Sequence, residues 1–355
     1  MTDVHVVVPD AIDDPSRPSG GNTYDRHVCR ELTSIGWWVH EHAIPGGWPQ
    51  SDPASLATLD AAIQGIPNGA VVLLDGLIAS AVPDVLVPQA ARLSLVVLVH
   101  MPLGHRPPDE RAGDVRMRER TVLAVATAVI TTSAWTRRRL VELYHLPPER
   151  VHVAAPGVAP ADLVTGAASG EALLCIAAVT FDKGHDVLLD ALATVTDRSW
   201  RCVCVGSLDR DAAFAEGLLR RSREAGLHNR VRFPGPRTGR DLDRAYAAAD
   251  LVVVPSRAES YGLVVIEALA RGLPVVATDV GGVPEALGRD TAAIRPGLLV
   301  PPDDPGALGV TLRAWFDGAD LRQSLRRAAR ERRERLPRWS NTASTIAAVL
   351  AGASR

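Results

Sequence analysis

The sequence predicts an α/β protein made of two domains, each built around a parallel sheet. Short runs of valine, leucine, isoleucine and alanine alternate along the chain with amphipathic helical patterns, which is typical of parallel sheets built from βα units. A chain of 355 residues exceeds what one hydrophobic core usually supports. The stretch at 156–170 is rich in alanine, glycine and proline and is suited to a linker. We therefore expect one domain at about 1–160 and a second at about 161–336.

Each half of the chain contains six expected strands, which are short apolar runs. Those of the first half lie at about 3–9, 37–43, 70–75, 94–100, 128–131 and 151–154. Those of the second half lie at about 172–179, 200–206, 230–233, 250–254, 274–277 and 298–300. The last segment, 337–355, begins with a proline and is expected to form a helix to about Ala351.

The composition predicts a soluble globular protein of the cytoplasm. With 46% hydrophobic residues, 23% charged residues and a net charge of −2, the chain offers no electrostatic basis for binding nucleic acid. Apolar runs such as Leu93 to Val99 are too short to cross a bilayer, and the N-terminus enters a strand without a signal peptide. The cysteines lack metal-ligand spacing and are expected to be buried, reduced thiols: Cys29, Cys175, Cys202 and Cys204.

Residues 254–285 carry the strongest chemical signal, because they place Glu259 and Glu267 eight positions apart around a predicted helix start. An apolar strand ends before them, a short polar loop follows, and Tyr261-Gly262 is expected to open a helix that runs to about Arg271. Glu259 then lies in the loop, and Glu267 lies between one and two turns inside the helix.

The start of this helix is a predicted phosphate site. The first backbone N–H groups of a helix have no partner inside it, and both these donors and the helix dipole favour an anion. The donors here belong to Gly262, Leu263 and Val264. Gly262 has no side chain and would let a phosphate approach the backbone closely. Two carboxylates beside an anion site suit a nucleotide sugar, whose charged centre joins two polyhydroxylated ends.

At this point the segment resembles the Glu-x7-Glu signature of the retaining glycosyltransferases of family 4. The resemblance implies the GT-B fold, in which two Rossmann-like domains face each other across a deep cleft. It also implies that Glu259 contacts the hydroxyls of the donor sugar and that Glu267 holds the ribose, with Tyr261 and the first-turn amides around the nucleotide. UDP- or GDP-sugar is the expected donor, and neither a cofactor nor a metal is required. The alternative is an amphipathic helix with solvated glutamates.

Lys183 is a second signal, because it is the single lysine among 39 basic residues. It lies between an apolar strand and a helix expected near Gly184-His185. A compact ammonium can neutralise a diphosphate as a point charge, and the resemblance implies that Lys183 faces the leaving phosphates. The alternative is a lysine on a solvated loop. The chain departs from many members at Ala178, where they carry an arginine; Arg257 is a candidate substitute.

The N-terminal half contributes Gly20-Gly21 and His100. A glycine-rich turn after the first strand is a place where ligands bind, and the resemblance places it over the donor phosphates. It lacks the third glycine of a dehydrogenase fingerprint. Its alternative role is a helix cap at Asn22. His100 follows an apolar strand and resembles the histidine near the reacting sugar, although it could be an ordinary loop histidine.

The resemblance covers nearly the whole chain, with its specific motifs in the C-terminal half. It implies a hexosyl-type transferase that retains anomeric configuration, with a small molecule, glycan or lipid as acceptor, and it assigns the last helix to the N-terminal domain. A sugar-nucleotide epimerase or hydrolase and a non-catalytic nucleotide-sugar-binding protein are the alternatives.

A basic run at 137–139, with arginines at 116, 118 and 120, is one feature that would suit peripheral contact with a membrane. A solvated helix face is favoured because acidic residues are interleaved with these arginines: Asp109, Glu110, Asp114 and Glu119.

Overall fold

The computed structural model describes residues 2–105, 112–288 and 294–354. Asp109 and Glu110 therefore lie outside the described residues. The chain forms two compact units. Unit 1 comprises Met1–Asp13, Gly20–Gly157 and Pro337–Arg355, and unit 2 comprises Asp14–Ser19 and Val158–Leu336. Apart from the short segment Asp14–Ser19, the change between the units falls after residue 157 and again after residue 336; the boundaries expected from the sequence are after residues 160 and 336.

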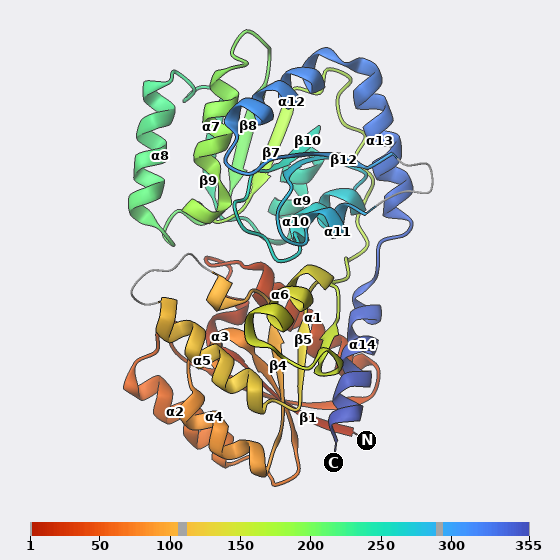
Figure 1. The fold of residues 1–355 in the computed structure, drawn as a ribbon. Coiled ribbons are helices and arrows are strands. Elements are labelled where there is room, and N and C mark those ends of the chain that lie inside the picture. Colours follow the sequence, from red (N-terminus) through yellow and green to blue (C-terminus); the bar gives the residue numbers. More distant parts are fainter. Residues whose placement is uncertain (1, 106–111, 289–293, 355) are drawn as a thin grey trace. The chain divides into compact units, whose positions relative to one another are not determined.

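Unit 1 contains a parallel sheet of six strands in the order β2-β1-β3-β4-β5-β6 (Figure 1). The strands are β1 Thr2–Pro9, β2 Trp37–Ile44, β3 Val71–Asp75, β4 Ser94–Val99, β5 Ala128–Thr131 and β6 Val151–Val153. The α-helices are α1 Gly20–Ser34, α2 Pro53–Gln64, α3 Gly76–Ala79, α4 Pro83–Leu86, α5 Ala112–Val125, α6 Ala134–Tyr144 and α14 Trp339–Ala353. Strands β3, β4 and β5 are buried along their whole length, which explains why they are apolar without alternation.

Unit 2 contains a second parallel sheet of six strands, in the order β12-β11-β10-β7-β8-β9. The strands are β7 Ala172–Ile176, β8 Arg201–Val205, β9 Val231–Gly235, β10 Leu251–Val254, β11 Val275–Thr278 and β12 Gly297–Val300. The α-helices are α7 His185–Ala193, α8 Ala212–Glu224, α9 Gly239–Ala247, α10 Leu263–Ala270, α11 Val283–Leu287, α12 Pro305–Asp317 and α13 Ala319–Arg333. All twelve predicted strands are present, each within a few residues of its expected bounds, so the predicted fold of two parallel-sheet domains is confirmed.

Helix α14 is an integral part of unit 1. The indole of Trp339 stacks on the ring of His27 with centroids 4.4 Å apart, and it meets the ring of Tyr24 edge-on at 5.4 Å. The Thr342 hydroxyl donates a hydrogen bond to the carbonyl of Ala155 at 2.8 Å. A Cβ at Gly157 would collide with the backbone at the start of α14, so a glycine is required for this close approach.

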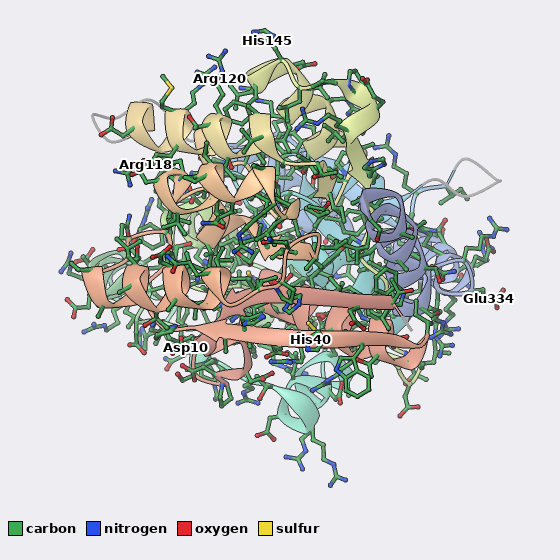
Figure 2. All side chains as sticks on the ribbon, turned by 90° about the horizontal axis from the view of Figure 1, so that it is seen from below. Asp10, His40, Arg118, Arg120, His145 and Glu334 are labelled. Carbon is green, nitrogen blue, oxygen red and sulfur yellow. The ribbon has the colours of Figure 1, made fainter. Side chains whose placement is uncertain are left out.

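The helices provide no transmembrane segment among the described residues: none is both long and apolar enough to span a bilayer. The arginines of α5 are exposed, and Figure 2 labels Arg118 and Arg120 among them. Glu119, expected on the same solvated face, is buried instead. Its carboxylate accepts hydrogen bonds from the Tyr144 hydroxyl and from the amides that follow β4, so it holds α5 against the sheet.

Candidate functional site

Two of the predicted site residues of unit 2 form an ion pair. Lys183 ends the short 3-10 turn Phe181–Lys183 between β7 and α7, and Glu259 lies in the loop between β10 and α10. The Lys183 Nζ lies 2.7 Å from Glu259 Oε2, and the two side chains are only 28% and 17% exposed. Because parallel strands end at one edge of the sheet, residues 76 positions apart meet there. Neither side chain is the freely solvated group of the alternative readings.

Arg257 braces the turn that carries Lys183. Its guanidinium binds Asp186 through two hydrogen bonds of 2.8 Å each, donates to the carbonyl of Phe181 at 2.6 Å and pairs with Asp303 at 2.5 Å. Burial works to raise the pKa of Asp186, but the hydrogen bonds from Arg257 outweigh it and lower that pKa. Arg257, the candidate substitute for the arginine that many members carry at position 178, is therefore already paired with two carboxylates. These pairs hold the loop in place.

A glycine pair behind the Glu259 loop was not recognised from the sequence. The amide of Gly282 donates to the carbonyl of Glu259 at 3.1 Å. Gly281 has φ +55, and a Cβ there would collide with that same carbonyl. The adjacent glycines shortly after β11, separated from it by two residues, were the available signal, since a close backbone approach requires them.

The start of α10 presents the expected donors. Gly262 precedes the helix with φ 98 and ψ 64, in the left-handed region. Within the described parts of the chain, the N–H groups of Gly262, Leu263 and Val264 have no hydrogen-bond acceptor. Tyr261 is buried and lies before the helix, so the predicted helix start at Tyr261 was two residues early. The arrangement is able to bind a phosphate.

Glu267 is oriented by a tyrosine that the sequence analysis missed. The Tyr246 hydroxyl, on α9, donates to Glu267 Oε2 at 2.7 Å. Burial raises the pKa of Glu267, while Tyr246 and Arg271 oppose the shift. The Arg271 guanidinium also covers the Tyr246 ring at 4.3 Å. One carboxylate oxygen is thus held by protein, and the other remains for a ligand hydroxyl.

In unit 1, His100 meets two aspartates at the carboxyl ends of the strands. His100 Nε2 lies 2.8 Å from Asp25 Oδ1, on α1, and 3.6 Å from Asp75 Oδ2, at the end of β3. Burial works to lower the pKa of His100, but the charges of Asp25 and Asp75 raise it to about 9. Burial, and then Asp25, raise the pKa of Asp75 to about 8. The imidazolium is therefore the favoured form at neutral pH.

The predicted glycine turn lies against this cluster. A Cβ on Gly21 would come 3.3 Å from His100 Cδ2, so the glycine lies directly against the imidazole ring. Gly20 opens α1, and Asn22 is inside the first turn, where its amide donates to the Ala11 carbonyl at 3.2 Å. The alternative of a helix cap at Asn22 is therefore wrong.

The same cluster has the composition of a cation site. One ligand atom each from Asp25, Asp75 and His100 lie within 4.8 Å of one another, and it is the one such group within the described residues. Asp25 Oδ2 is buried without a hydrogen-bond partner. The sequence analysis missed Asp25 and Asp75. An aspartate ending a fully apolar strand was the signal for Asp75, whereas Asp25 reads as an ordinary helix residue.

Both halves of the chain match sequence models of glycosyltransferases. Residues 3–162 match the model described as Glycosyltransferase Family 4, and residues 170–317 match the model described as Glycosyl transferases group 1. The chain is 35% identical over 252 residues to a D-inositol 3-phosphate glycosyltransferase of Jonesia denitrificans, an alignment that covers 65% of this chain and 58% of the relative. For the relative of the same name in Salinispora arenicola, the identity is 32% over 289 residues, covering 74% and 62%. The chain thus spans less than two thirds of these relatives' length.

Solved structures show the same fold. Sucrose-phosphate synthase from Thermosynechococcus elongatus matches with a TM-score of 0.82 and 22% identity over 99% of both chains. Anabaena HepE, solved in complex with UDP-glucose, matches with a TM-score of 0.76 and 19% identity, covering 99% of this chain and 100% of that one. At these identities the likeness establishes the fold alone, which is GT-B.

Proposed function

Because this chain belongs to the glycosyltransferases of group 1 and family 4, matched over residues 170–317 and 3–162 respectively, we propose that it is a retaining glycosyltransferase that moves a hexosyl group from a nucleotide sugar to an acceptor. The observation that carries the proposal is the constellation in unit 2. A lysine and a carboxylate pair at 2.7 Å beside a helix start whose first amides are free. A second carboxylate, Glu267, lies one to two turns further on.

Each residue has a proposed role in holding the donor. The diphosphate binds the amides of Gly262, Leu263 and Val264, and the ammonium of Lys183 neutralises its charge. Glu259 exchanges its contact with Lys183 for the sugar hydroxyls. Glu267, held by Tyr246 on one oxygen, binds the ribose with the other.

In the proposed reaction, the bond between the anomeric carbon and the phosphate oxygen breaks, and its electron pair leaves with the diphosphate. The acceptor oxygen bonds to the same face of the sugar, and its proton passes to a phosphate oxygen of the leaving group. The rate then depends on stabilising the leaving diphosphate. His100, with Gly20 and Gly21 beside it, is proposed to position the donor sugar.

The donor and acceptor are proposed from the relatives. HepE has been solved in complex with UDP-glucose, so a UDP-sugar is the first donor to test, with GDP-sugars next. The curated relatives are named for inositol 3-phosphate, which makes that polyol phosphate the first acceptor to test. Lys183 of unit 2 is the chain's single lysine, so an acceptor phosphate bound to unit 1 would depend on arginine or histidine. We further propose that the enzyme works in the cytoplasm.

We propose that no metal is needed, because an ammonium and a helix start can meet the diphosphate charge. Turnover should then be unchanged after exhaustive treatment with EDTA. If chelation abolished turnover and Mg²⁺ or Mn²⁺ restored it, the cluster of Asp25, Asp75 and His100 would be the first place to look for the ion.

The test begins with a thermal-shift panel of UDP-, GDP-, ADP- and dTDP-sugars, since a bound ligand raises the melting temperature by mass action. Calorimetry with the selected donor follows. Glu267→Ala should weaken the nucleoside diphosphate and its sugar conjugate alike, by about 1.5 to 3 kcal/mol, whereas Glu259→Ala should spare the bare nucleotide. Equal losses of bare-nucleotide affinity would contradict these roles.

The product completes the test. Its anomeric configuration, measured from the proton coupling constant of the new linkage, should equal that of the donor, and inversion would overturn the mechanism. Turnover of the nucleotide sugar without an acceptor would favour the epimerase or hydrolase, and binding without any turnover would favour a sensor.

A further inference from the structure

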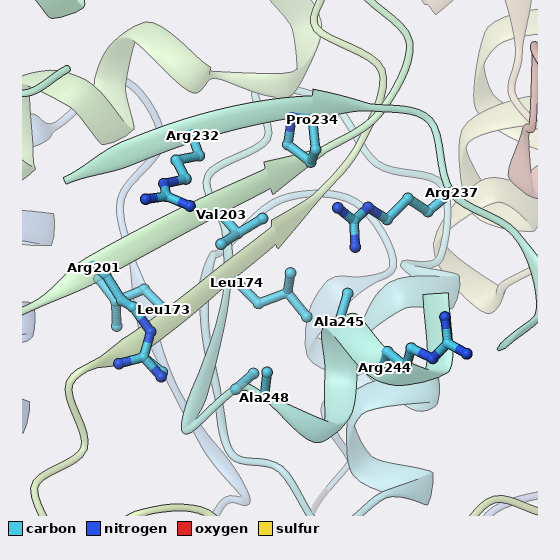
Figure 3. A pocket seen from close by; sticks show the side chains of 12 residues that line it. Leu173, Leu174, Arg201, Val203, Arg232, Pro234, Arg237, Arg244, Ala245 and Ala248 are labelled. Atoms are coloured by element: carbon cyan, nitrogen blue, oxygen red, sulfur yellow. The ribbon is translucent and has the colours of Figure 1, made fainter. Parts of the chain in front are cut away.

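Unit 2 contains a hollow of about 290 Å³ on one face of its sheet (Figure 3). Its floor is apolar and is formed by residues of β7, β8 and α9, including Leu174, Val203 and Ala245. Figure 3 shows four arginines spaced around this floor, from β8, β9, the loop after β9 and α9: Arg201, Arg232, Arg237 and Arg244. The hollow therefore combines an apolar floor with a cationic rim.

Part of this face of the sheet is exposed, because Arg201 on β8 and Arg232 on β9 are exposed. The side chains that point to the opposite face of these strands, such as Cys175, Cys202 and Val231, belong to the main core together with α7 and α8. Parallel sheets are generally covered on both faces. Here α9, a helix of nine residues, borders the hollow, and the outward side of β8 and β9 carries arginines in place of core residues.

Three of the four rim arginines lack anionic partners among the described residues. Across the parts of the chain that the structure describes, no carboxylate lies within 4.0 Å of the guanidinium groups of Arg201, Arg232 or Arg237. Arg244 pairs only with the exposed Asp241. Like charges gathered around an apolar surface repel one another, and a bound anion removes that repulsion. The planar guanidinium matches a carboxylate bidentately.

The side of the hollow formed by Arg201 and Arg232 lies away from the proposed donor site, whereas Arg237 follows the carboxyl end of β9 and α9 also carries Tyr246, the partner of Glu267. Arg201 begins β8 and Arg232 is the second residue of β9, whereas Lys183 and Gly262 follow the carboxyl ends of β7 and β10. The amino and carboxyl ends of parallel strands lie at opposite edges of a sheet.

We propose that this hollow binds a small amphipathic anion, with a carboxylate head on the arginine rim and a short alkyl chain on the apolar floor. Its volume of about 290 Å³ is at the small end of ligand pockets, which run from about 300 to 1,000 Å³, and so fits a single short chain. The proposal does not depend on the glycosyltransferase activity.

The test is calorimetry on the full chain with octanoate as the probe. Octanoate should bind saturably with one site per chain. Acetate, which has the head without the chain, and octanol, which has the chain without the charge, should each bind at least about tenfold more weakly, because each loses one of the two contributions.

Two kinds of variant test the contribution of the carboxylate head of octanoate separately from that of its alkyl chain. Arg232→Gln and Arg201→Gln should each weaken octanoate about tenfold or more. The matched control is Arg220→Gln, an exposed arginine on α8, which should change nothing. Ala245→Phe fills the floor without changing charge and should abolish binding, with folding checked by circular dichroism. If that variant does not fold, the arginine variants still decide.

Three results would overturn the proposal. The first is equal affinity for octanoate and acetate, which would mean adventitious anion binding only. The second is displacement of octanoate by UDP, which would make the hollow part of the donor site. The third is self-association by light scattering that Arg232→Gln abolishes, which would make this face an interface between copies of the chain.

Discussion

The ion pair of Lys183 and Glu259 gives each group a second role when no donor is bound. Each partner neutralises the other, and a diphosphate would have to draw Lys183 away from Glu259. The exchange leaves the carboxylate available for sugar hydroxyls at the moment the ammonium meets the phosphates. Two groups that are separately predicted to bind adjoining parts of one ligand, its diphosphate and its sugar, are thereby kept paired in its absence.

Replacing Lys183 tests whether its ammonium group stabilises the negative charge of the leaving diphosphate. We expect Lys183→Ala to lower turnover about a hundredfold, since one preorganised charge or donor of this kind is worth about 3 kcal/mol of barrier. Lys183→Arg should recover only part of the rate, because a guanidinium has a different shape and hydrogen-bond geometry. Steady-state kinetics on a verified donor measures both. Wild-type turnover in Lys183→Ala would remove Lys183 from the mechanism.

The cluster around His100 predicts a pH dependence. His100 has its pKa raised to about 9, so its stabilising contribution is fully present below its unfolded value of about 6.5 and is lost as pH rises through 9. Asp75, with its pKa raised to about 8, also favours the protonated form in the fold. His100 therefore makes unfolding easier as pH rises from about 6.5 to 9, and Asp75 does so as pH rises from about 4 to 8. Urea denaturation between pH 5 and 9 should show the falling free energy of unfolding.

Asp25→Asn provides the control for this pH dependence. It removes the nearer charge, so the imidazole signal of His100 in NMR should titrate well below pH 9 because burial now prevails. An unchanged His100 titration in Asp25→Asn would contradict the assignment of the shift to this pair.

Residue-level chemistry was predictable where composition or spacing was unusual. A single lysine and a pair of glutamates eight positions apart stand out in the sequence. The partners Asp25, Asp75 and Tyr246 do not. Their pairing follows from strand register and helix placement, as when the Asp75–Leu98 pairing of β3 and β4 brings His100 near Asp75. A local sequence pattern does not show contacts between residues that lie far apart in the sequence.

At the scale of elements, the loop that carries Glu259 depends on the Gly281-Gly282 turn behind it. Gly281→Ala should lower turnover and reduce the free energy of unfolding, because its Cβ would collide with the Glu259 carbonyl and its φ of +55 alone costs a non-glycine residue about 1–2 kcal/mol. Gly226→Ala is the matched control, with φ +70 and open space around its Cβ. It should share the backbone cost without the loss of turnover; equal turnover in the two variants would contradict the role of Gly281.

Strands were easier to predict than helix starts. Each buried strand is an uninterrupted apolar run, which few other structures resemble. The start of α10 was set two residues early, because Tyr261 is buried before the helix and Gly262 takes a left-handed conformation. Burial of Glu119 on α5 was missed for a related reason: a glutamate among arginines reads as solvated until Tyr144 and two amides are seen to satisfy it.

At the scale of the whole molecule, the chain ends in the unit where it began. The main part of unit 2, Val158–Leu336, separates α14 from the rest of unit 1 in the sequence, so α14 packs against residues far from it along the chain. Composition and periodicity predicted a helix here but could not say which unit it packs on; only the resemblance did. The contacts of Trp339 with Tyr24 and His27 supply the physical reason.

Trp339→Ala should destabilise unit 1 and spare the nucleotide site of unit 2. Truncating a buried tryptophan typically costs about 3–5 kcal/mol, and Trp339 is only 6% exposed. Hydrogen exchange followed by mass spectrometry should show faster exchange in α1, which Trp339 contacts through Tyr24 and His27, and unchanged exchange in α10. The affinity for UDP should stay within about twofold. Trp38→Ala is the control, since Trp38 is 58% exposed on β2 of the same unit and should leave both helices unaffected. Faster exchange in α10 after Trp339→Ala would show that the last helix supports the donor site as well, and the separate roles given to the two units would then be wrong.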